Sequence, residues 1–264
     1  MTQLPLDSPR PASDSERVCK VTVAYDGTGF HGFAAQRDQR TVEGELASAL
    51  ARVVRAPIEL SCAGRTDAGV HAWGQVVSCR LPESFSDDDR VAQLPRAVNG
   101  QLAPEIVVRD AALVDDTFDA RHSARSRSYR YTIVNRDAPD PFLARTAWWV
   151  PASLDLTLLR LGADPFLGEH DFASFCRSGP PGSSTVRRVV ESRWCEVGDG
   201  VLRYDITASA FCWQMVRSIV GTLVDVGTGR LTPGDVLRIV RARDRAVAGR
   251  VAPPEGLCLW SVAY

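Results

Sequence analysis

The sequence predicts a mixed α+β protein built in two halves. Short runs in which apolar residues alternate with polar ones, typical of strands, are interspersed with longer runs of helical spacing along the whole chain. The 264 residues suffice for one large domain or two modest ones, each with its own core. We place the boundary near 113–120, and expect domains at 18–113 and 114–264. The polar, proline-bearing segment 1–17 is interpreted as a disordered leader.

The first half is expected to contain four strands and two helices. In 18–25 the apolar residues Val21, Val23 and Tyr25 alternate with polar neighbours, as in a half-buried strand. Thr41 precedes apolar residues at helical spacing and is a suitable N-cap. Ser86, followed by three aspartates, is typical of a helix start, with Pro95 as a weak point. The expected strands are 18–25, 58–62, 75–81 and 105–114, and the expected helices are 42–53 and 86–99.

The second half repeats this mixture. Segment 127–135 alternates as a strand, placing Tyr129 and Tyr131 on one face. Pro165 is expected to end a helix that begins near residue 154, and Thr232 to cap a last helix with Pro233 in its first turn. Further strands are expected at 188–197, 201–209 and 256–264, a buried helix at 212–226, a breaker loop at 137–142 and a mobile loop at 177–187.

Composition narrows the class of protein. No apolar run approaches the roughly 18 residues that a membrane-spanning helix needs. The seven cysteines are scattered without a CxxC pair, and the four histidines lack metal-ligand spacing. We therefore expect a reduced, cytoplasmic protein without metal, its cysteines being ordinary core or strand residues, although Cys212 is a candidate for modification.

The stretch "CAGRTDAGVHAWGQ" (62–75) holds the strongest candidate for chemistry. Asp67 follows Arg65 by two residues and lies in a turn between two strand-like runs. An aspartate there can simply stabilise the bend. The small residues Ala68 and Gly69, however, would let another molecule approach the carboxylate. The pattern leaves both interpretations open.

Arginine supplies almost all the positive charge, since Lys20 is the single lysine. The net charge is −1, so any binding of nucleic acid must depend on local clusters. One cluster, "ARHSARSRSYRY" (120–131), interleaves arginine with tyrosine and contains no acid. Such a pattern is compatible with RNA, and equally with solvated strand faces.

Six ordered motifs resemble the TruA family of tRNA pseudouridine synthases. They are "YDGTGFHGF" (25–33), "GRTDAGVHAWGQV" (64–76), "RSYRY" (127–131), "GEHDFASF" (168–175), "MVRSIVG" (215–221) and "APPEGLCLWSV" (252–262). The resemblance runs from about residue 18 to Tyr264. It implies an isomerase that converts uridine to pseudouridine at tRNA positions 38, 39 and 40. It also implies two ferredoxin-like (RRM-like) α/β sandwich domains with a joined antiparallel sheet and a central positively charged cleft, in a homodimer that needs no cofactor.

The resemblance assigns roles residue by residue. Asp67 matches the catalytic aspartate, a nucleophile, and Arg217 matches the arginine paired with it. Arg65 matches the residue associated with flipping the target base, and Tyr129 the tyrosine packed against that base. A buried Arg217 also requires a carboxylate partner on physical grounds, and Asp67 is the candidate. His71 is interpreted as structural.

Three positions depart from the family pattern. Phe33 and Ala34 stand where the family usually has Trp-Gln after glycine. In 118–121, Phe118 and Arg121 match the ends of the family's Phe-His-Ala-Arg, and both are expected to bind substrate. Asp119 replaces the histidine, and we expect its charge to weaken contact between Arg121 and phosphate. Trp213-Gln214 replaces a stretch that often carries histidine. We expect none of the three departures to touch the catalytic set.

The reaction type leaves a question about Tyr129. If Asp67 assists departure of the base, a proton must leave the sugar, and the Tyr129 hydroxyl is a candidate acceptor. A tyrosine has a reference pKa of about 10, so a nearby cation such as Arg217 would have to favour the phenolate. The alternative functions are a family member with another RNA or other uridines, a non-catalytic RNA-binding module, and an enzyme that uses an aspartate nucleophile on a small metabolite.

Overall fold

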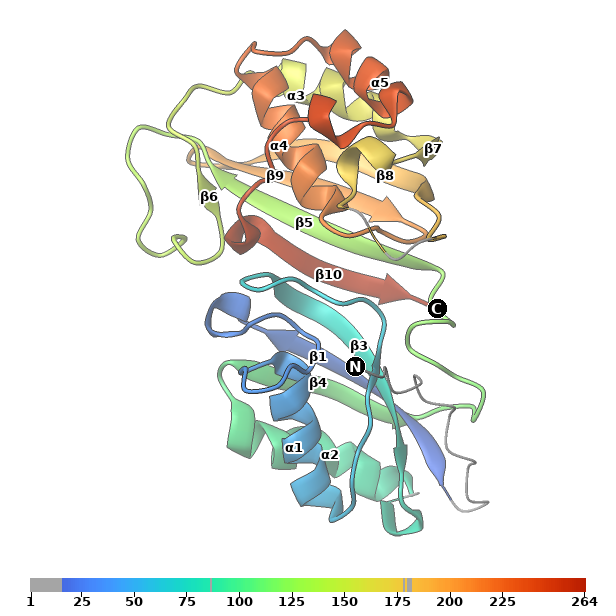
Figure 1. The fold of residues 1–264 in the computed structure, drawn as a ribbon. Helices are drawn as coiled ribbons and strands as arrows, with labels where there is room; N and C mark the ends of the chain where they lie inside the picture. Colours follow the sequence, from blue (N-terminus) through green and yellow to red (C-terminus); the bar gives the residue numbers. More distant parts are fainter. Residues whose placement is uncertain (1–15, 86, 178, 180–181) are drawn as a thin grey trace.

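The computed structural model describes residues 16–85, 87–177, 179 and 182–264, and its strands form one continuous ten-stranded sheet (Figure 1). The leader predicted at 1–17 lies almost entirely outside the described residues; Arg17 already belongs to the first strand. The main path of the sheet is β4-β1-β3-β10-β5-β9-β8-β7, with β2 paired to β3 and β6 paired to β5.

The first half has the elements that its periodicity predicted. They are β1 (Arg17–Tyr25), α1 (Val42–Val54), β2 (Ser61–Cys62), β3 (His71–Leu81), α2 (Asp88–Leu102) and β4 (Ile106–Leu113). The Thr41 hydroxyl accepts from the Gly44 N–H at 3.3 Å, as expected of an N-cap. Asp87 caps α2, whereas the predicted start at Ser86 lies outside the described residues. The helix continues past Pro95, which cannot donate a helix hydrogen bond.

The second half follows the order of the first, namely strand, helix, two strands, helix and strand, with three added elements, β6, β7 and α5. Its elements are β5 (Ser126–Val134), β6 (Trp148–Trp149), α3 (Leu156–Ala163), β7 (Gly168–Asp171), β8 (Val186–Gly198), β9 (Val201–Ala208), α4 (Met215–Gly227), α5 (Pro233–Ala242) and β10 (Leu257–Ala263). A capping box between Thr232 and Asp235 begins α5. The two shortest strands here, β6 and β7, carry too few residues for a pattern and were not predicted. Part of the loop expected at 177–187 lies outside the described residues.

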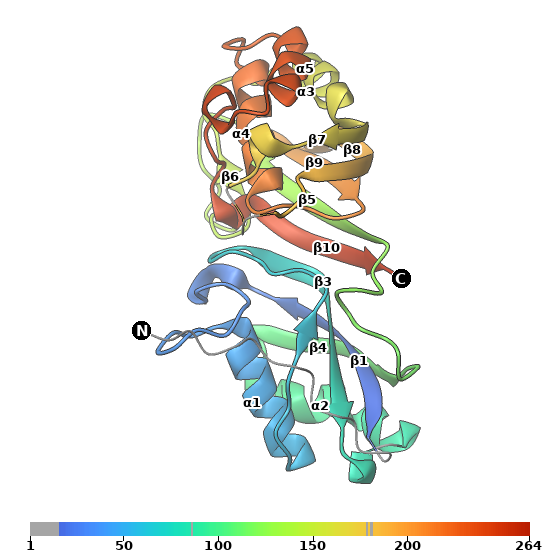
Figure 2. The same cartoon turned by 45° about the vertical axis from the view of Figure 1, so that its right-hand side comes forward.

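The two halves meet where β10 lies beside β3 (Figures 1 and 2). The pairing is parallel and short, with Cys258 opposite His71 and Leu259 opposite Ala72. The prediction of a joined antiparallel sheet is therefore wrong at this seam. β10 runs antiparallel to β5 on one side, and in this direction it is parallel to β3 on its other side.

The register places both helical layers on the same face of the sheet. Tyr25 pairs with Ala72, Ala72 with Leu259, and Leu259 with Tyr129, and all four side chains are buried. Side chains opposite each other across a pair of strands share a face. The helices of each half thus cover one common face, above and below the seam in Figure 1. The described helices include none that is long and apolar enough to span a bilayer.

Candidate active site

The loop between β2 and β3 holds Asp67 in a fixed position close to the seam. The Thr66 carbonyl accepts from the Phe33 N–H at 3.0 Å, and the Thr66 and Tyr25 hydroxyls lie 2.8 Å apart. Gly32 has φ +93°, and a Cβ on it would lie 2.9 Å from the Thr66 carbonyl oxygen, so a glycine is needed for the loop to pack here. These contacts anchor Thr66, the residue before Asp67, and the Asp67 side chain is directed away from the first half.

Asp67 forms an ion pair with Arg217 of α4, 150 residues further along the chain. The Arg217 Nη1 lies 3.1 Å from the Asp67 Oδ2. The Arg217 side chain is 13% exposed and that of Asp67 29% exposed, so the pair is shielded on the arginine side and accessible on the carboxylate side. The Arg217 Nε also donates to the Ala252 carbonyl at 2.7 Å, which fixes the direction of the guanidinium. The structure thus brings these two predicted residues together.

Tyr129 lies beneath the loop and is buried. Its ring meets Phe211 edge-on at 4.9 Å between centroids, and a Cβ on Gly64 would lie 3.7 Å from its hydroxyl oxygen. Burial raises the pKa of the Tyr129 hydroxyl well above its usual value, Arg127 opposes the rise, and the charge of Asp67 adds to it. The hydroxyl is therefore neutral near pH 7. This argues against the predicted proton acceptor, which needed a lowered pKa.

Besides Tyr129, three residues are predicted to bind substrate, and they have different surroundings. Arg65 is exposed at the tip of the loop and makes no hydrogen bond or ion pair with any described residue. The Arg121 side chain is likewise exposed. Phe118 is half-buried and packs against Tyr264 at 4.8 Å between centroids, behind the loop at Ala63. Phe118 thus has a packing role that the sequence did not indicate.

Asp119 stabilises the turn that carries Arg121. Its Oδ1 accepts from the backbone N–H groups of Arg121 at 2.8 Å and His122 at 2.7 Å. Although burial acts to raise the pKa of Asp119, hydrogen bonds from the His122 N–H, the Ser61 side chain and the Arg121 N–H lower it. Its hydrogen bonds are thus made with the backbone of the turn and with the Ser61 side chain, and they favour the charged carboxylate. The effect of this charge on contact between Arg121 and phosphate stays a prediction.

The arginine cluster at 120–131 divides into two kinds. Arg121 and Arg125 are exposed, whereas the Arg127 guanidinium donates to the backbone carbonyls of Ala63, Ala124, Arg121 and Ser209. Because these acceptors belong to both halves, Arg127 joins the loop between β2 and β3 to the second half.

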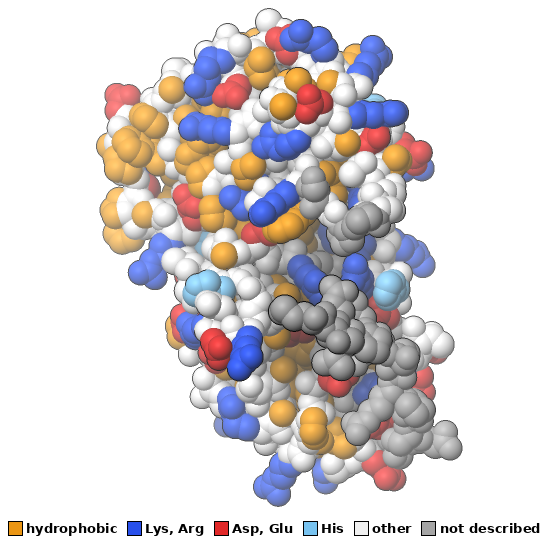
Figure 3. All heavy atoms as spheres, viewed as in Figure 1, with side chains coloured by type: hydrophobic (Ala, Val, Ile, Leu, Met, Phe, Trp, Pro, Cys, Tyr) orange, Lys and Arg blue, Asp and Glu red, His pale blue; other side chains and the backbone are white. Residues whose placement is uncertain are grey.

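Arg130 points to the helix-free face of the sheet. Its Nε lies 3.1 Å from the Asp205 Oδ1, and its guanidinium carbon is 3.5 Å from the Trp260 ring centroid. Arg127 and Arg130 therefore have internal partners, and only part of the cluster is available to RNA. Figure 3 shows basic side chains over both halves of the visible face, mixed with acidic ones.

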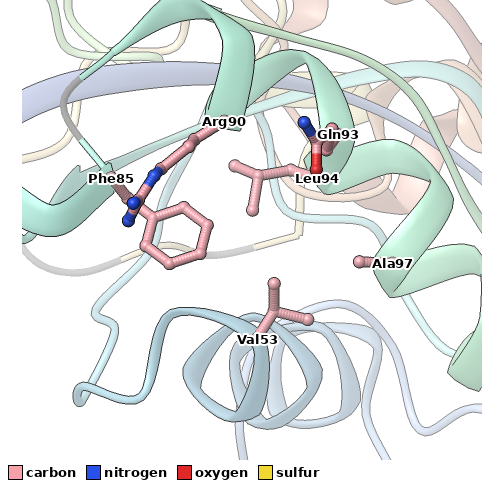
Figure 4. Close-up of a pocket in the computed structure, with 6 residues that line it drawn as sticks. All are labelled: Val53, Phe85, Arg90, Gln93, Leu94 and Ala97. Atoms are coloured by element: carbon pink, nitrogen blue, oxygen red, sulfur yellow. The ribbon is translucent and has the colours of Figure 1, made fainter.

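A small hollow of about 220 Å³ lies between α1 and α2 (Figure 4). Its lining is Val53, Phe85, Arg90, Gln93, Leu94 and Ala97, none of which belongs to the predicted site. Among the described residues, no group of three or more histidine, cysteine, aspartate or glutamate side chains is arranged to hold a metal ion. The candidate active site is accordingly the surface around Asp67.

Comparison with known proteins decides the family. The chain is 42% identical to tRNA pseudouridine synthase A of Bacillus licheniformis, over 93% of this chain and 98% of that one. The corresponding enzymes of Bacillus subtilis and Leifsonia xyli are 40% and 41% identical, each over 93% of this chain and over 98% and 91% of theirs. This chain belongs to the TruA family. A family model described as tRNA pseudouridine synthase also matches residues 163–264.

Solved structures add little. The archaeal box H/ACA sRNP Nop10–Cbf5 complex aligns with a TM-score of 0.32 and 12% identity, over 78% of this chain and 44% of that chain. A likeness this weak carries no argument about the fold.

One departure from the TruA pattern does touch the catalytic set, contrary to the prediction. The Trp213 Nε1 donates to the Asp67 Oδ1 at 2.9 Å, so both oxygens of the carboxylate accept a hydrogen bond. Gln214, between Trp213 and α4, has φ +63°, and this left-handed turn places Trp213 outside the helix. No helical or strand periodicity could have revealed its direction.

A disulfide joins Cys176 to Cys212, next to Trp213. Their Cα atoms lie 5.7 Å apart, within the range that a disulfide spans. The predictions that the protein is reduced and that its cysteines are all ordinary core or strand residues are therefore wrong for this pair. Outside it, the five cysteines at 19, 62, 79, 195 and 258 are free. The 36-residue separation of the pair gives no sequence signal.

Proposed function

We propose that the protein isomerises uridine to pseudouridine in tRNA, at positions 38, 39 and 40 of the anticodon arm. The observation that carries this proposal is the Asp67–Arg217 ion pair, on a rigid loop, in a chain of the TruA family. An accessible carboxylate held by a shielded arginine suits attack on a sugar carbon. Carboxylates have the same role in retaining glycosidases.

The reaction exchanges one bond for another without net oxidation or hydrolysis. The bond between uracil N1 and ribose C1′ breaks, the uracil turns, and a bond forms between C5 and C1′. The hydrogen on C5 leaves as a proton, and N1 gains one. In this proposal Asp67 attacks C1′ and holds the ribose while the base is free. Arg217 neutralises the carboxylate in the ground state and fixes its direction.

The target base must first leave its stack, which costs a few kcal/mol. Arg65 suits this step because its guanidinium is exposed at the tip of the loop, two residues from Asp67, without a partner among the described residues. It can occupy the vacated space or bind a phosphate bidentately. Tyr129 borders the loop from below, where its ring can pack against the uracil. Arg121 is placed to contact a phosphate.

We further propose that two chains form a homodimer in the cytoplasm, since a single chain of this size offers limited surface for an L-shaped tRNA. The ferredoxin-like description of each half, the domain limits at 18–113 and 114–264, and the positively charged cleft belong to the same proposal. The common order of elements in the two halves supports the first of these.

The decisive experiment maps pseudouridine in an unmodified tRNA transcript after incubation with the protein. We expect modification at positions 38–40 with the wild-type chain and none with Asp67→Asn, which keeps the shape of the side chain. Asp115→Asn is the matched control, because the Asp115 Oδ1 bonds only within its own exposed turn, to Thr117. Modification at other uridines would indicate a different site choice. No modification by the wild-type chain, with tRNA bound, would indicate a non-catalytic RNA-binding module.

A further inference from the structure

Trp213 makes a contact with the catalytic carboxylate that complements that of Arg217. Its indole N–H donates to the Asp67 Oδ1 at 2.9 Å, while Arg217 donates to Oδ2 at 3.1 Å. A carboxylate held at one oxygen can still rotate about the bond to its Cβ atom. A second donor on the other oxygen fixes the plane of the group. Since the indole nitrogen can only donate, the contact has a single direction.

The indole is itself held on several sides. The Arg177 guanidinium carbon lies 4.2 Å from the Trp213 ring centroid, and the backbone N–H of Arg177 donates to the backbone carbonyl of Trp213 at 2.9 Å. The residues just before each of these two, Cys176 and Cys212, are joined by the disulfide. The segment after β7 and the segment before α4 thus form one cross-linked support beneath the indole.

This amount of support is unusual for an indole that is 47% exposed. An exposed aromatic side chain loses conformational entropy when it is fixed, so its contacts must offset that cost. Here those contacts end at an oxygen of the proposed nucleophile. Trp149, which is 41% exposed, offers the contrast within the same chain, because its indole N–H donates to the backbone carbonyl of Arg136 and to no ionised side chain among the described residues.

We propose that Trp213 is a positioning residue for pseudouridine formation: its indole N–H orients the Asp67 carboxylate, and the Cys176–Cys212 disulfide with Arg177 keeps the indole in place. The proposal rests on the proposed role of Asp67. In a pre-organised site the donor acts by holding the carboxylate in the attacking direction, so its loss slows the chemical step and leaves tRNA affinity unchanged.

The test compares single-turnover rates at saturating protein with dissociation constants for the same unmodified tRNA transcript. Trp213→Phe keeps a ring and removes the N–H. We expect its rate to fall roughly tenfold or more, the factor typical for losing a charge-assisted hydrogen bond, with tRNA affinity within about threefold. Trp213→His offers a donor again and should recover part of the rate. Trp149→Phe is the matched control and should react at the wild-type rate.

Three outcomes would overturn the assignment. A Trp213→Phe rate equal to wild type would show that the N–H does not orient Asp67. Equal losses in the Phe and His variants would show that the donor is not what matters. A loss confined to tRNA affinity would make Trp213 a stacking surface for the RNA. Asp67→Asn is run in parallel: if it reacts like wild type, the role of Asp67 fails, whereas an inactive Asp67→Asn beside a fully active Trp213→Phe refutes only the positioning role.

The support is tested by replacing Cys176 and Cys212 together with serine. We expect a smaller loss of rate in the wild-type background and no further loss in the Trp213→Phe background, because the disulfide acts through the indole. A full additional loss in the Trp213→Phe background would show that the disulfide acts elsewhere. Thermal unfolding of each variant establishes that the fold survives.

Discussion

Asp67 and Arg217 should stabilise the fold jointly, in addition to their proposed catalytic roles. Replacing Asp67 with alanine leaves the Arg217 guanidinium, with its side chain 13% exposed, without a counter-charge. Breaking a fully buried pair costs about 3–5 kcal/mol. The Asp67 side chain is 29% exposed, so water can enter its place and hydrate the Arg217 guanidinium in part. We therefore expect the free energy of unfolding to fall by about 1–3 kcal/mol. This corresponds to a fall in Tm of about 2–12 °C.

Arg217→Met keeps much of the length of the side chain and removes its charge. It also loses the bond from Nε to the Ala252 carbonyl, which should make it at least as destabilising as Asp67→Ala. In the double variant neither charge remains, so the cost should be less than the sum of the two. We expect a coupling of about 1–2 kcal/mol between them.

Urea unfolding followed by far-UV circular dichroism measures these differences, with Asp115→Ala as a control that should change stability little. Independent effects, with a coupling below about 0.5 kcal/mol, would refute the idea that the pair is energetically linked. Equal stability of Asp67→Ala and wild type would show that Arg217 is adequately solvated without its partner.

Three further outcomes are expected. Tyr129→Phe should keep turnover within a few-fold across the neutral pH range, because burial raises the pKa of Tyr129 and the wild-type hydroxyl is therefore not ionised there. Tyr129→Leu should lose most turnover, whereas a nearly inactive Tyr129→Phe would restore the proton-acceptor hypothesis. Arg121→Ala should weaken tRNA binding and flatten the log–log dependence on salt by about one phosphate contact, while Arg127→Ala should lower the Tm; an unchanged salt slope would show that Arg121 does not face phosphate. Analytical ultracentrifugation at micromolar concentration should find a dimer, and an active monomer would contradict the proposed assembly.

The Asp67–Arg217 contact was predicted from the resemblance to the TruA family, which pairs these two positions, and from the charge balance of the two residues. An arginine on an apolar helix needs a carboxylate, and a motif of small residues around an aspartate offers one. Helices and long strands were likewise predictable, because each has enough residues to show a period. The two-residue strand β6 has too few to show one, whereas β2 is the end of the longer strand predicted at 58–62.

What the sequence missed depends on direction and on distant partners. Trp213 was assigned no contact with the site, because the left-handed turn at Gln214 decides where it points. Arg121 and Arg127 lie in the same arginine-rich stretch of sequence. The Arg121 side chain is exposed, whereas the Arg127 guanidinium donates to backbone carbonyls. The pairing of Cys176 with Cys212 depends on two loops meeting, which no spacing along the chain indicates.

The short parallel seam between β10 and β3 also affects the order of events during synthesis. β3 leaves the ribosome long before β10, and domains generally begin to fold in the order in which they emerge. The first half can build its own core while the edge of β3 at His71 and Ala72 waits for a strand nearly 190 residues later. Pairings of such high sequence separation form late in folding. Asp67 meets Arg217 across the same seam, from a position 150 residues earlier, so the nascent chain acquires its proposed nucleophile early and the partner of that nucleophile only late in translation.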